Sequence, residues 1–243
     1  QDYSHALHWY KLSANKNLPY SQHMLGWMYY NGQGTARDYN MTISLYEQAC
    51  AADYGPALND YALMFYDGTG VEQDYERAAE LLKRAAEQNF AKSQYALGWM
   101  YFNGQGLQRN EQKAADYFRK AAEQGFSKAQ TNLGLMYLKG QGVAYDDNMA
   151  AYWLQQAAQQ GRPLAMTNLG LMYIKGRGFR QDYAKAGECF RIAALHGEAT
   201  AQYKLAVMYE NGRGVEQDNF EAYKWFTIAS LCGHPDAGGQ QQR

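Results

Sequence analysis

Apolar and polar positions along the chain repeat with a fixed period. Residues 91–126 read as an apolar run with helical spacing, a Gly-x-Gly turn, a second helical run rich in alanine, and a closing glycine. The same plan returns every 36 residues without insertion or deletion. The turns fall at Gly32/Gly34, Gly68/Gly70, Gly104/Gly106, Gly140/Gly142, Gly176/Gly178 and Gly212/Gly214. A period of this length is typical of a solenoid, in which each unit packs only against its neighbours.

The first half of each period predicts a helix with one apolar face. Seven residues before the turn comes a leucine or tyrosine, then a glycine or alanine, and three residues later an aromatic; Leu97, Gly98 and Tyr101 are one such set. Their spacing puts the three on one helical face. A glycine inside a helix costs up to about 1 kcal/mol relative to alanine. We therefore expect another helix to pass close to Gly98 and its counterparts Gly26, Gly134 and Gly170. A methionine that returns in every period is interpreted as core.

The second half of each period predicts a capped helix. Six residues after the first glycine comes an acid or amide that suits the N-cap position: Asp38, Asp74, Asn110, Asp146, Asp182 and Asp218. Such a side chain accepts a hydrogen bond from an unpaired backbone amide. We interpret these acids as caps and not as catalytic groups. The second helix ends in alanine pairs and a glycine, which suits close packing of the next repeat.

These elements predict an all-α solenoid of 36-residue helix-turn-helix repeats. Residues 1–18 form the second helix of a partial repeat, and residues 235–243 form a C-terminal tail or the start of a further repeat. The six full repeats are 19–54, 55–90, 91–126, 127–162, 163–198 and 199–234. Because the tail lacks the leucine and tyrosine of a first helix, we expect Trp225 and Phe226 to be less covered than their counterparts.

Composition and charge exclude several classes of function. The net charge is −1 and no long run of like charges occurs, which argues against a nucleic acid partner. No apolar stretch approaches the length of a membrane span, so no membrane insertion is expected. The N-terminal residues lack the features of a secretory signal, but the chain starts within a repeat and a preceding segment is compatible with that. The sequence does not indicate an oligomeric state.

The residues that carry most enzyme and metal chemistry do not form recognisable sets. Cys50 stands in a column of alanines and is interpreted as a small core residue. His5 and His8 share a helical face with i, i+3 spacing, but no thiol or carboxylate completes a metal site with them and His23. The Gly-x-Gly turns lack the lysine and hydroxyl of a phosphate-binding loop. We predict no metal site, no cofactor and no catalytic residue.

Several segments resemble the SEL-1-like repeats, which are relatives of the tetratricopeptide repeats. The resemblance rests on LGWMYFNGQG (Leu97–Gly106), LGLMYLKGQGV (Leu133–Val143), LGLMYIKGRG (Leu169–Gly178) and KAAEQG (Lys120–Gly125). It implies a right-handed alpha-alpha superhelix and an adaptor that holds partners in signalling, secretion or cell-envelope complexes. Several bacterial members act outside the cytoplasm, which favours a periplasmic or secreted location. The cysteine pairs of the disulfide-stapled branch of the family are missing.

The resemblance also implies where a partner binds. First-helix side chains line the concave groove of related arrays, and the equivalent positions here are Tyr20, His23, Trp27, Tyr30, Asn59, Tyr66, Lys92, Tyr95, Trp99, Phe102, Lys139 and Lys175. The aromatics among them are typical binding hot spots. A second interpretation stays open for Trp27 and Trp99, because their column is apolar in all six repeats and is also compatible with packing between helices.

The sequence therefore predicts a non-catalytic protein–protein interaction scaffold. Its expected ligand is a peptide or protein segment held in the groove. A glycan or cell-wall fragment stacked on the groove aromatics is the alternative.

Overall fold

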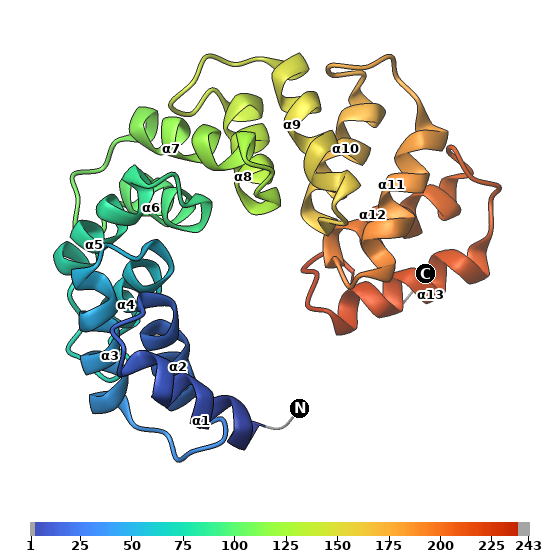
Figure 1. Cartoon of the computed structure of the whole chain (residues 1–243). Coiled ribbons are helices and arrows are strands. Elements are labelled where there is room, and N and C mark those ends of the chain that lie inside the picture. Colours follow the sequence, from blue (N-terminus) through green and yellow to red (C-terminus); the bar gives the residue numbers. More distant parts are fainter. Residues whose placement is uncertain (1–2, 238–243) are drawn as a thin grey trace. The chain divides into compact units, whose positions relative to one another are not determined.

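The computed structural model describes residues 3–237, so residues 1–2 and most of the predicted tail 235–243 lie outside the described residues. The chain divides into two units, residues 1–121 and 122–243. Within the described range every regular element is an α-helix, which confirms the predicted all-α fold of helix-turn-helix repeats. The helices are α1 (Tyr3–Ala14), α2 (Pro19–Asn31), α3 (Tyr39–Ala51), α4 (Gly55–Asp67), α5 (Tyr75–Glu87), α6 (Ala91–Asn103), α7 (Glu111–Glu123), α8 (Ser127–Lys139), α9 (Asp147–Gln159), α10 (Pro163–Lys175), α11 (Tyr183–Leu195), α12 (Ala199–Asn211) and α13 (Asn219–Leu231) (Figure 1).

Each repeat is a pair of helices that pack along one another. In the first unit α2 packs on α3 and α4 on α5, and in the second unit α8 packs on α9, α10 on α11 and α12 on α13. The second helix of one repeat then contacts the first helix of the next, as α3 contacts α4 and α11 contacts α12. The apolar face of a helix is thus covered partly within its repeat and partly by the next one. None of the described helices combines the length and the apolar character of a membrane span.

The turn between the paired helices is fixed by glycine and by a capping acid. Gly68, which ends α4, has a φ of 69° and Gly70 has a φ of 74°, a region that glycine enters without strain. The amide of Asp74 donates to the carbonyl of Phe65 at 2.9 Å and folds the loop back on α4. The Asp74 side chain accepts from the amide of Arg77 at 2.9 Å. The predicted N-caps are confirmed at Asp38, Asp74, Asn110, Asp146, Asp182 and Asp218.

The mid-helix glycines mark the closest approach of the two helices of a repeat. A Cβ atom added at Gly98 would lie 2.6 Å from the ring of Phe118 on α7, which is well inside van der Waals contact. The equivalent pairs are Gly26 with Tyr46, Gly134 with Leu154, and Gly170 with Phe190. The expected close approach is confirmed, and the neighbour is the second helix of the same repeat.

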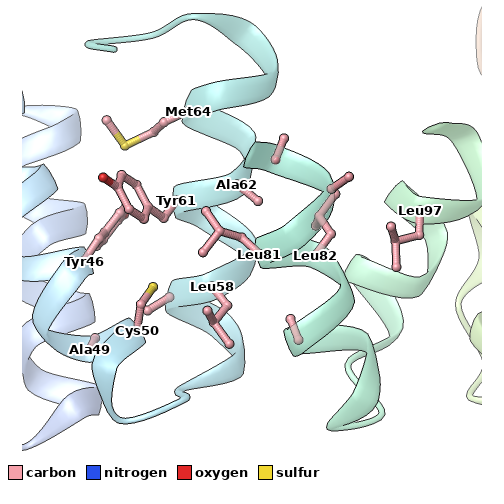
Figure 2. Packing of buried hydrophobic residues seen from close by; sticks show 14 of the residues in the cluster. Tyr46, Ala49, Cys50, Leu58, Tyr61, Ala62, Met64, Leu81, Leu82 and Leu97 are labelled. Carbon is pink, nitrogen blue, oxygen red and sulfur yellow. The ribbon is translucent and has the colours of Figure 1, made fainter. Parts of the chain in front are cut away.

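The core of the first unit lies where α3, α4 and α5 meet. Tyr46, Leu58 and Leu82 are fully buried there, and Figure 2 shows Tyr46 of α3 beside Tyr61 of α4. Burial raises the pKa of the Tyr46 hydroxyl far above its ordinary value, so this group stays neutral. The repeated methionines are buried as predicted, at Met28, Met64, Met100, Met136, Met172 and Met208.

Two of the three cysteines are held as neutral thiols. Burial raises the pKa of Cys50 to about 12 and that of Cys189 to about 11. Cys50 lies in the apolar cluster of Figure 2, as its alanine column predicts. Cys232 is exposed just after α13. A thiol with a raised pKa is a poor nucleophile, so Cys50 and Cys189 are structural residues.

Trp225 and Phe226 were expected to be less covered than their counterparts, and the difference is small. Phe226 is 4% exposed, against 2% for Phe118 and 0% for Phe190, and Trp225 is 8% exposed, against 7% for Trp153. Phe226 packs on the ring of Tyr203 of its own repeat at 5.6 Å between centroids. Other side chains of α13 are exposed, with Phe220 at 75% and Leu231 at 83%.

Asp74→Ala is expected to lower the free energy of unfolding by about 1 kcal/mol, because it removes the acceptor for the Arg77 amide. Urea unfolding measures the change. Glu72→Ala is the control, since Glu72 is an exposed acid in the same loop that caps no helix. Equal effects of the two substitutions would show that the cap contributes nothing.

Gly98→Leu is expected to lower the free energy of unfolding by about 2 kcal/mol or more, because the new side chain meets Phe118. Gln112→Leu on α7 is the control, since it places leucine at an exposed helical position. Thermal unfolding of both variants tests the contact. A Gly98→Leu variant as stable as the control would contradict the close approach of α6 and α7.

Candidate partner-binding surface

The structure places the twelve predicted groove residues in three environments. Four are exposed: Tyr20, Lys92, Lys139 and Lys175. Six are half-buried: Trp27, Tyr30, Tyr66, Tyr95, Trp99 and Phe102. His23 and Asn59 are buried, with 8% and 3% of their surface exposed, and so offer little area to a partner.

A hollow of about 210 Å³ lies between the first helices α2 and α4. We call it the first-unit hollow. It combines aromatic rings with two carboxylates, and its lining residues are Trp27, Tyr30, Asn31, Tyr46, Asp60, Leu63, Met64 and Asp67. Two of the predicted aromatic anchors thus border a concave feature.

Tyr30 and Tyr66 are held in place by the second helices of their own repeats. The ring of Tyr30 meets Tyr39 edge to face at 5.7 Å, and that of Tyr66 meets Tyr75 at 5.2 Å. The Tyr66 hydroxyl also donates to Oε1 of Gln105 at 2.7 Å. Rings fixed in this way lose little further freedom when a ligand binds.

A row of three aromatics follows one face of α6. Trp99 lies 6.4 Å from Tyr95 and 5.7 Å from Phe102 between ring centroids, and it also packs on Phe118 of α7 at 5.9 Å. Trp99 thus has a packing role within its repeat. It is nevertheless only half-buried, as Phe102 is. Trp99 is therefore packed on one side and partly accessible, and its role in a groove stays a prediction.

A chain of polar side chains that sequence reasoning missed runs beside the first-unit hollow. His23 Nε2 lies 2.8 Å from Oδ2 of Asp60, and Asn59 Nδ2 donates to Oδ1 of Asp60 at 2.9 Å. The hydroxyl of Ser93, on α6, donates to Oδ1 of Asn59 at 3.0 Å. These bonds fix the Asp60 carboxylate. The signal in the sequence was a polar column, Asp60, Asn132, Asn168 and Lys204, within otherwise apolar helices.

His23 is surrounded in a way that explains its burial. Its ring lies 5.5 Å from that of Tyr46 and 5.7 Å from that of Tyr54, between centroids. His5 and His8 lie on the exposed side of α1. Within residues 3–237, no three His, Cys, Asp or Glu side chains are grouped as a metal site requires.

A second hollow of about 210 Å³ lies between the first helices α8 and α10. We call it the second-unit hollow. Aliphatic and basic residues line it: Leu135, Leu138, Lys139, Asn168, Leu171, Met172, Lys175 and Arg177. Two of the three predicted lysines, Lys139 and Lys175, therefore border a concave feature of the second unit.

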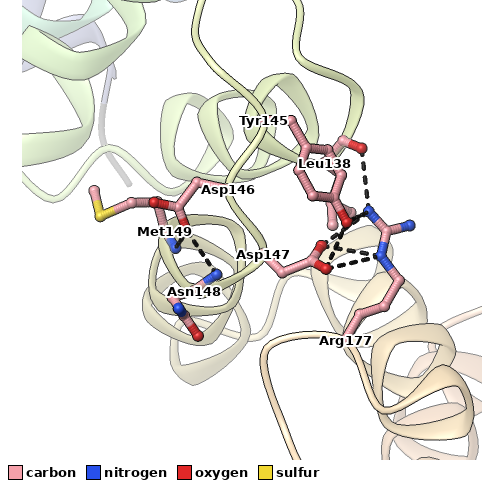
Figure 3. Close-up of polar contacts among 7 residues, drawn as sticks. All are labelled: Leu138, Tyr145, Asp146, Asp147, Asn148, Met149 and Arg177. Atoms are coloured by element: carbon pink, nitrogen blue, oxygen red, sulfur yellow. Dashed lines mark hydrogen bonds and ion pairs between the residues drawn. The ribbon is translucent and has the colours of Figure 1, made fainter.

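Arg177 of the Gly-x-Gly turn is already paired. Its Nε donates to Oδ1 of Asp147 at 2.9 Å, and its Nη2 donates to the Tyr145 hydroxyl at 2.7 Å and to the Leu138 carbonyl at 3.3 Å (Figure 3). Partial burial acts to raise the pKa of the Asp147 carboxyl, but hydrogen bonds from Arg177 and Tyr145 outweigh it and hold that pKa below its ordinary value. The positive charge of Arg177 is thus compensated, whereas Lys139 and Lys175 are exposed.

Comparison with protein families gives one match that runs through the whole repeat array. The profile of the Sel1 repeat matches residues 1–18, 19–54, 55–90, 91–126, 127–161, 163–198 and 199–234. No curated protein sequence matches the chain.

Solved structures show the same fold. The chain is similar to a protective antigen of uropathogenic Escherichia coli strains that displays an SLR fold, with 32% identity and a TM-score of 0.93 over 97% of this chain and 50% of that one. It is similar to a Sel1 repeat protein of Oxalobacter formigenes, with 32% identity and a TM-score of 0.85 over 99% of this chain and 70% of that one. A Sel1 repeat protein of Klebsiella pneumoniae, at 24% identity and a TM-score of 0.52 over 82% and 97%, shares the fold alone. The chain thus spans half the length of the E. coli protein.

Asp147→Asn is expected to lower the free energy of unfolding at pH 7 by less than about 1 kcal/mol, since the pair with Arg177 is partly exposed. The lowered pKa of Asp147 means that its contribution is complete above the unfolded-state pKa of about 3.9 and is lost as the pH falls through the lower folded-state value. The difference between wild type and variant should therefore shrink below pH 4. Urea unfolding across pH 2.5–7 measures it.

Asp116→Asn serves as the control, because Asp116 belongs to a more exposed pair with Arg119. A difference between Asp147→Asn and wild type that stays constant down to pH 2.5 would refute the assignment.

Proposed function

The chain belongs to the Sel1-repeat family, whose members are generally protein-interaction scaffolds, and on that premise we propose that it is a non-catalytic adaptor. It binds a peptide or protein segment along the exposed positions of its first helices. The aromatic side chains of α2, α4 and α6 anchor a segment on the first unit, and the lysines of α8 and α10 contact a segment on the second unit through charge.

One observation carries this proposal: a series of aromatic rings on α2, α4 and α6 is half-buried, and each ring packs on the second helix of its own repeat. Tyr30 rests on Tyr39, Tyr66 on Tyr75, and Trp99 on Phe118. Large rings with little freedom to lose are the side chains that dominate binding energy at protein interfaces. A side chain needed only for the core would be fully buried, as Phe118 is.

The size of the hollows supports an extended ligand. Each has about 210 Å³, which is below the roughly 300–1,000 Å³ of a typical small-molecule pocket. Such a hollow suits one side chain of a longer segment that continues along neighbouring helices. The strongly shifted groups Tyr46 and Cys50 support a non-catalytic role, because burial keeps both in their neutral, unreactive form.

Selection of random peptides on the immobilised chain, beside a glycan array, tests the proposal. Trp27→Leu and Trp99→Leu are expected to weaken the selected peptides about tenfold or more, because an aromatic anchor is lost. Leucine at this position is compatible with folding, since Leu63, Leu135 and Leu171 occupy it in other repeats.

Trp9→Leu is the matched control, because Trp9 is 67% exposed on α1 and lines neither hollow. Peptides that bind all three variants as well as wild type would overturn the proposal. Binding of glycans, and of no peptides, in a manner that depends on Trp27 would replace it with the glycan alternative.

A further inference from the structure

The two hollows occupy equivalent places in their units and carry opposite charge. Three repeats separate the residues that line them, and every lining position but one in each has a counterpart in the other. The pairs are Trp27 and Leu135, Tyr30 and Leu138, Asn31 and Lys139, Asp60 and Asn168, Leu63 and Leu171, Met64 and Met172, and Asp67 and Lys175. The scaffold is thus the same, and the charged positions differ.

The first-unit hollow lies in a strongly acidic part of the chain. The three helices that form it, α2, α3 and α4, contain no lysine or arginine, and their acids are Glu47, Asp60 and Asp67. Arg37, in the turn before α3, has its guanidinium group 6.0 Å from the ring centroid of Tyr39. Since no cation lines the hollow, Asp60 and Asp67 give it a negative potential.

Asp60 is prepared to hold a cation. Its side chain is 33% exposed, so it is partly removed from water, and Asn59 and His23 fix both of its oxygens. Carboxylate charge in a partly dry site interacts more strongly with a ligand than in bulk water. Trp27, on the opposite helix, adds the ring type that attracts cations best.

The second-unit hollow has the opposite character. The first helices α8 and α10 contain no aspartate or glutamate, and each ends in a lysine that lines the hollow, Lys139 and Lys175. Asp147, on α9, is hydrogen-bonded to Arg177, which lines the hollow, and the positive charge of Arg177 compensates the negative charge of Asp147. Two exposed ammonium groups beside Leu135 and Leu171 therefore give the hollow a positive potential.

We infer that the first-unit hollow receives a lysine or arginine side chain of a peptide segment bound by that unit, and that the second-unit hollow receives an aspartate or glutamate of a segment bound by its own unit. The inference rests on the proposed peptide-binding function and adds the chemistry of its ligand. Charge complementarity of this kind sets specificity and binding register more than total affinity. Each hollow selects independently, because each lies within one unit.

Exchanging charged residues between the two hollows tests the inference. Each substitution introduces the residue that stands at the equivalent position of the other hollow. Asp60→Asn combined with Asp67→Lys gives the first-unit hollow the residues found at Asn168 and Lys175. Lys139→Asn combined with Lys175→Asp gives the second-unit hollow the residues found at Asn31 and Asp67. Random dodecapeptides are selected on the wild-type chain and on each double variant, and their Lys, Arg, Asp and Glu frequencies are compared with the unselected library.

Wild type is expected to enrich peptides with Lys or Arg, which the first unit binds, and peptides with Asp or Glu, which the second unit binds. The first-unit variant should lose the enrichment of Lys and Arg and keep that of Asp and Glu, and the second-unit variant should do the reverse. For a selected peptide, replacing its basic residue with glutamine should weaken binding to wild type about tenfold and leave binding to the first-unit variant unchanged. Glu87→Lys, at an exposed position of α5, controls for the altered net charge and should behave as wild type.

The outcomes separate this inference from the proposed function. Selected peptides that depend on Trp27 but show no charge enrichment, or the same enrichment on both double variants, would overturn the inference and leave the proposed function standing. Failure to select any peptide that depends on Trp27 or Trp99 would overturn both. Thermal unfolding of each double variant should match that of wild type. A lost preference for charged peptides is then due to the altered hollow and not to a loss of the fold.

Discussion

Each repeat depends on the contact between a residue of the first helix that has almost no side chain and a large residue of the second. Gly98 lies against Phe118 and Gly134 against Leu154, at distances that leave no room for a Cβ atom. The contact brings the two helix axes close together and covers one side of the large residue. In the last described helix pair, Tyr203 likewise packs on Phe226 from within the same repeat.

Because of this contact, the remaining face of each first helix has a smaller part in packing the core. Positions there tolerate Trp27 in one repeat and Leu63 or Leu135 in others, and acids in one place where lysines stand in another. Half-burial of the larger side chains follows from this arrangement, because the second helix supports one side of a ring and leaves the other accessible. A surface that varies on a constant frame is what an adaptor needs to distinguish partners.

Polar contacts fix the side chains that lie at the two hollows. In the first unit, buried His23 and Asn59 hold the carboxylate of Asp60. In the second unit, Arg177 ties its turn to Asp147 and Tyr145 (Figure 3). Both networks join residues of different repeats. They fix side chains beside the hollows that would otherwise be mobile on helix surfaces, and they leave Asp67, Lys139 and Lys175 as the exposed charges.

The sequence by itself determined the helices, their turns and their caps, because each of these depends on residues close together in the chain. The Gly-x-Gly pairs allow the positive φ values of the turn, and Asp74 finds its amide three residues away. The repeat period also indicated which columns form the core, and the buried methionines agree with it. The candidate surface was predicted only in outline, as a set of columns on the first helices.

Only the tertiary structure decided how far each of those side chains is exposed. His23 and Asn59 stand in one column, which holds half-buried Tyr95 and Tyr203 in other repeats, and their own burial goes with hydrogen bonds to the following repeat, between His23 and Asp60 and between Asn59 and Ser93. Trp99 is half-buried because Phe118 lies beneath it. The charge of each hollow likewise depends on which side chains of two successive first helices meet. Exposure and charge are properties of residues brought together in space, and a periodic pattern along one chain does not contain them.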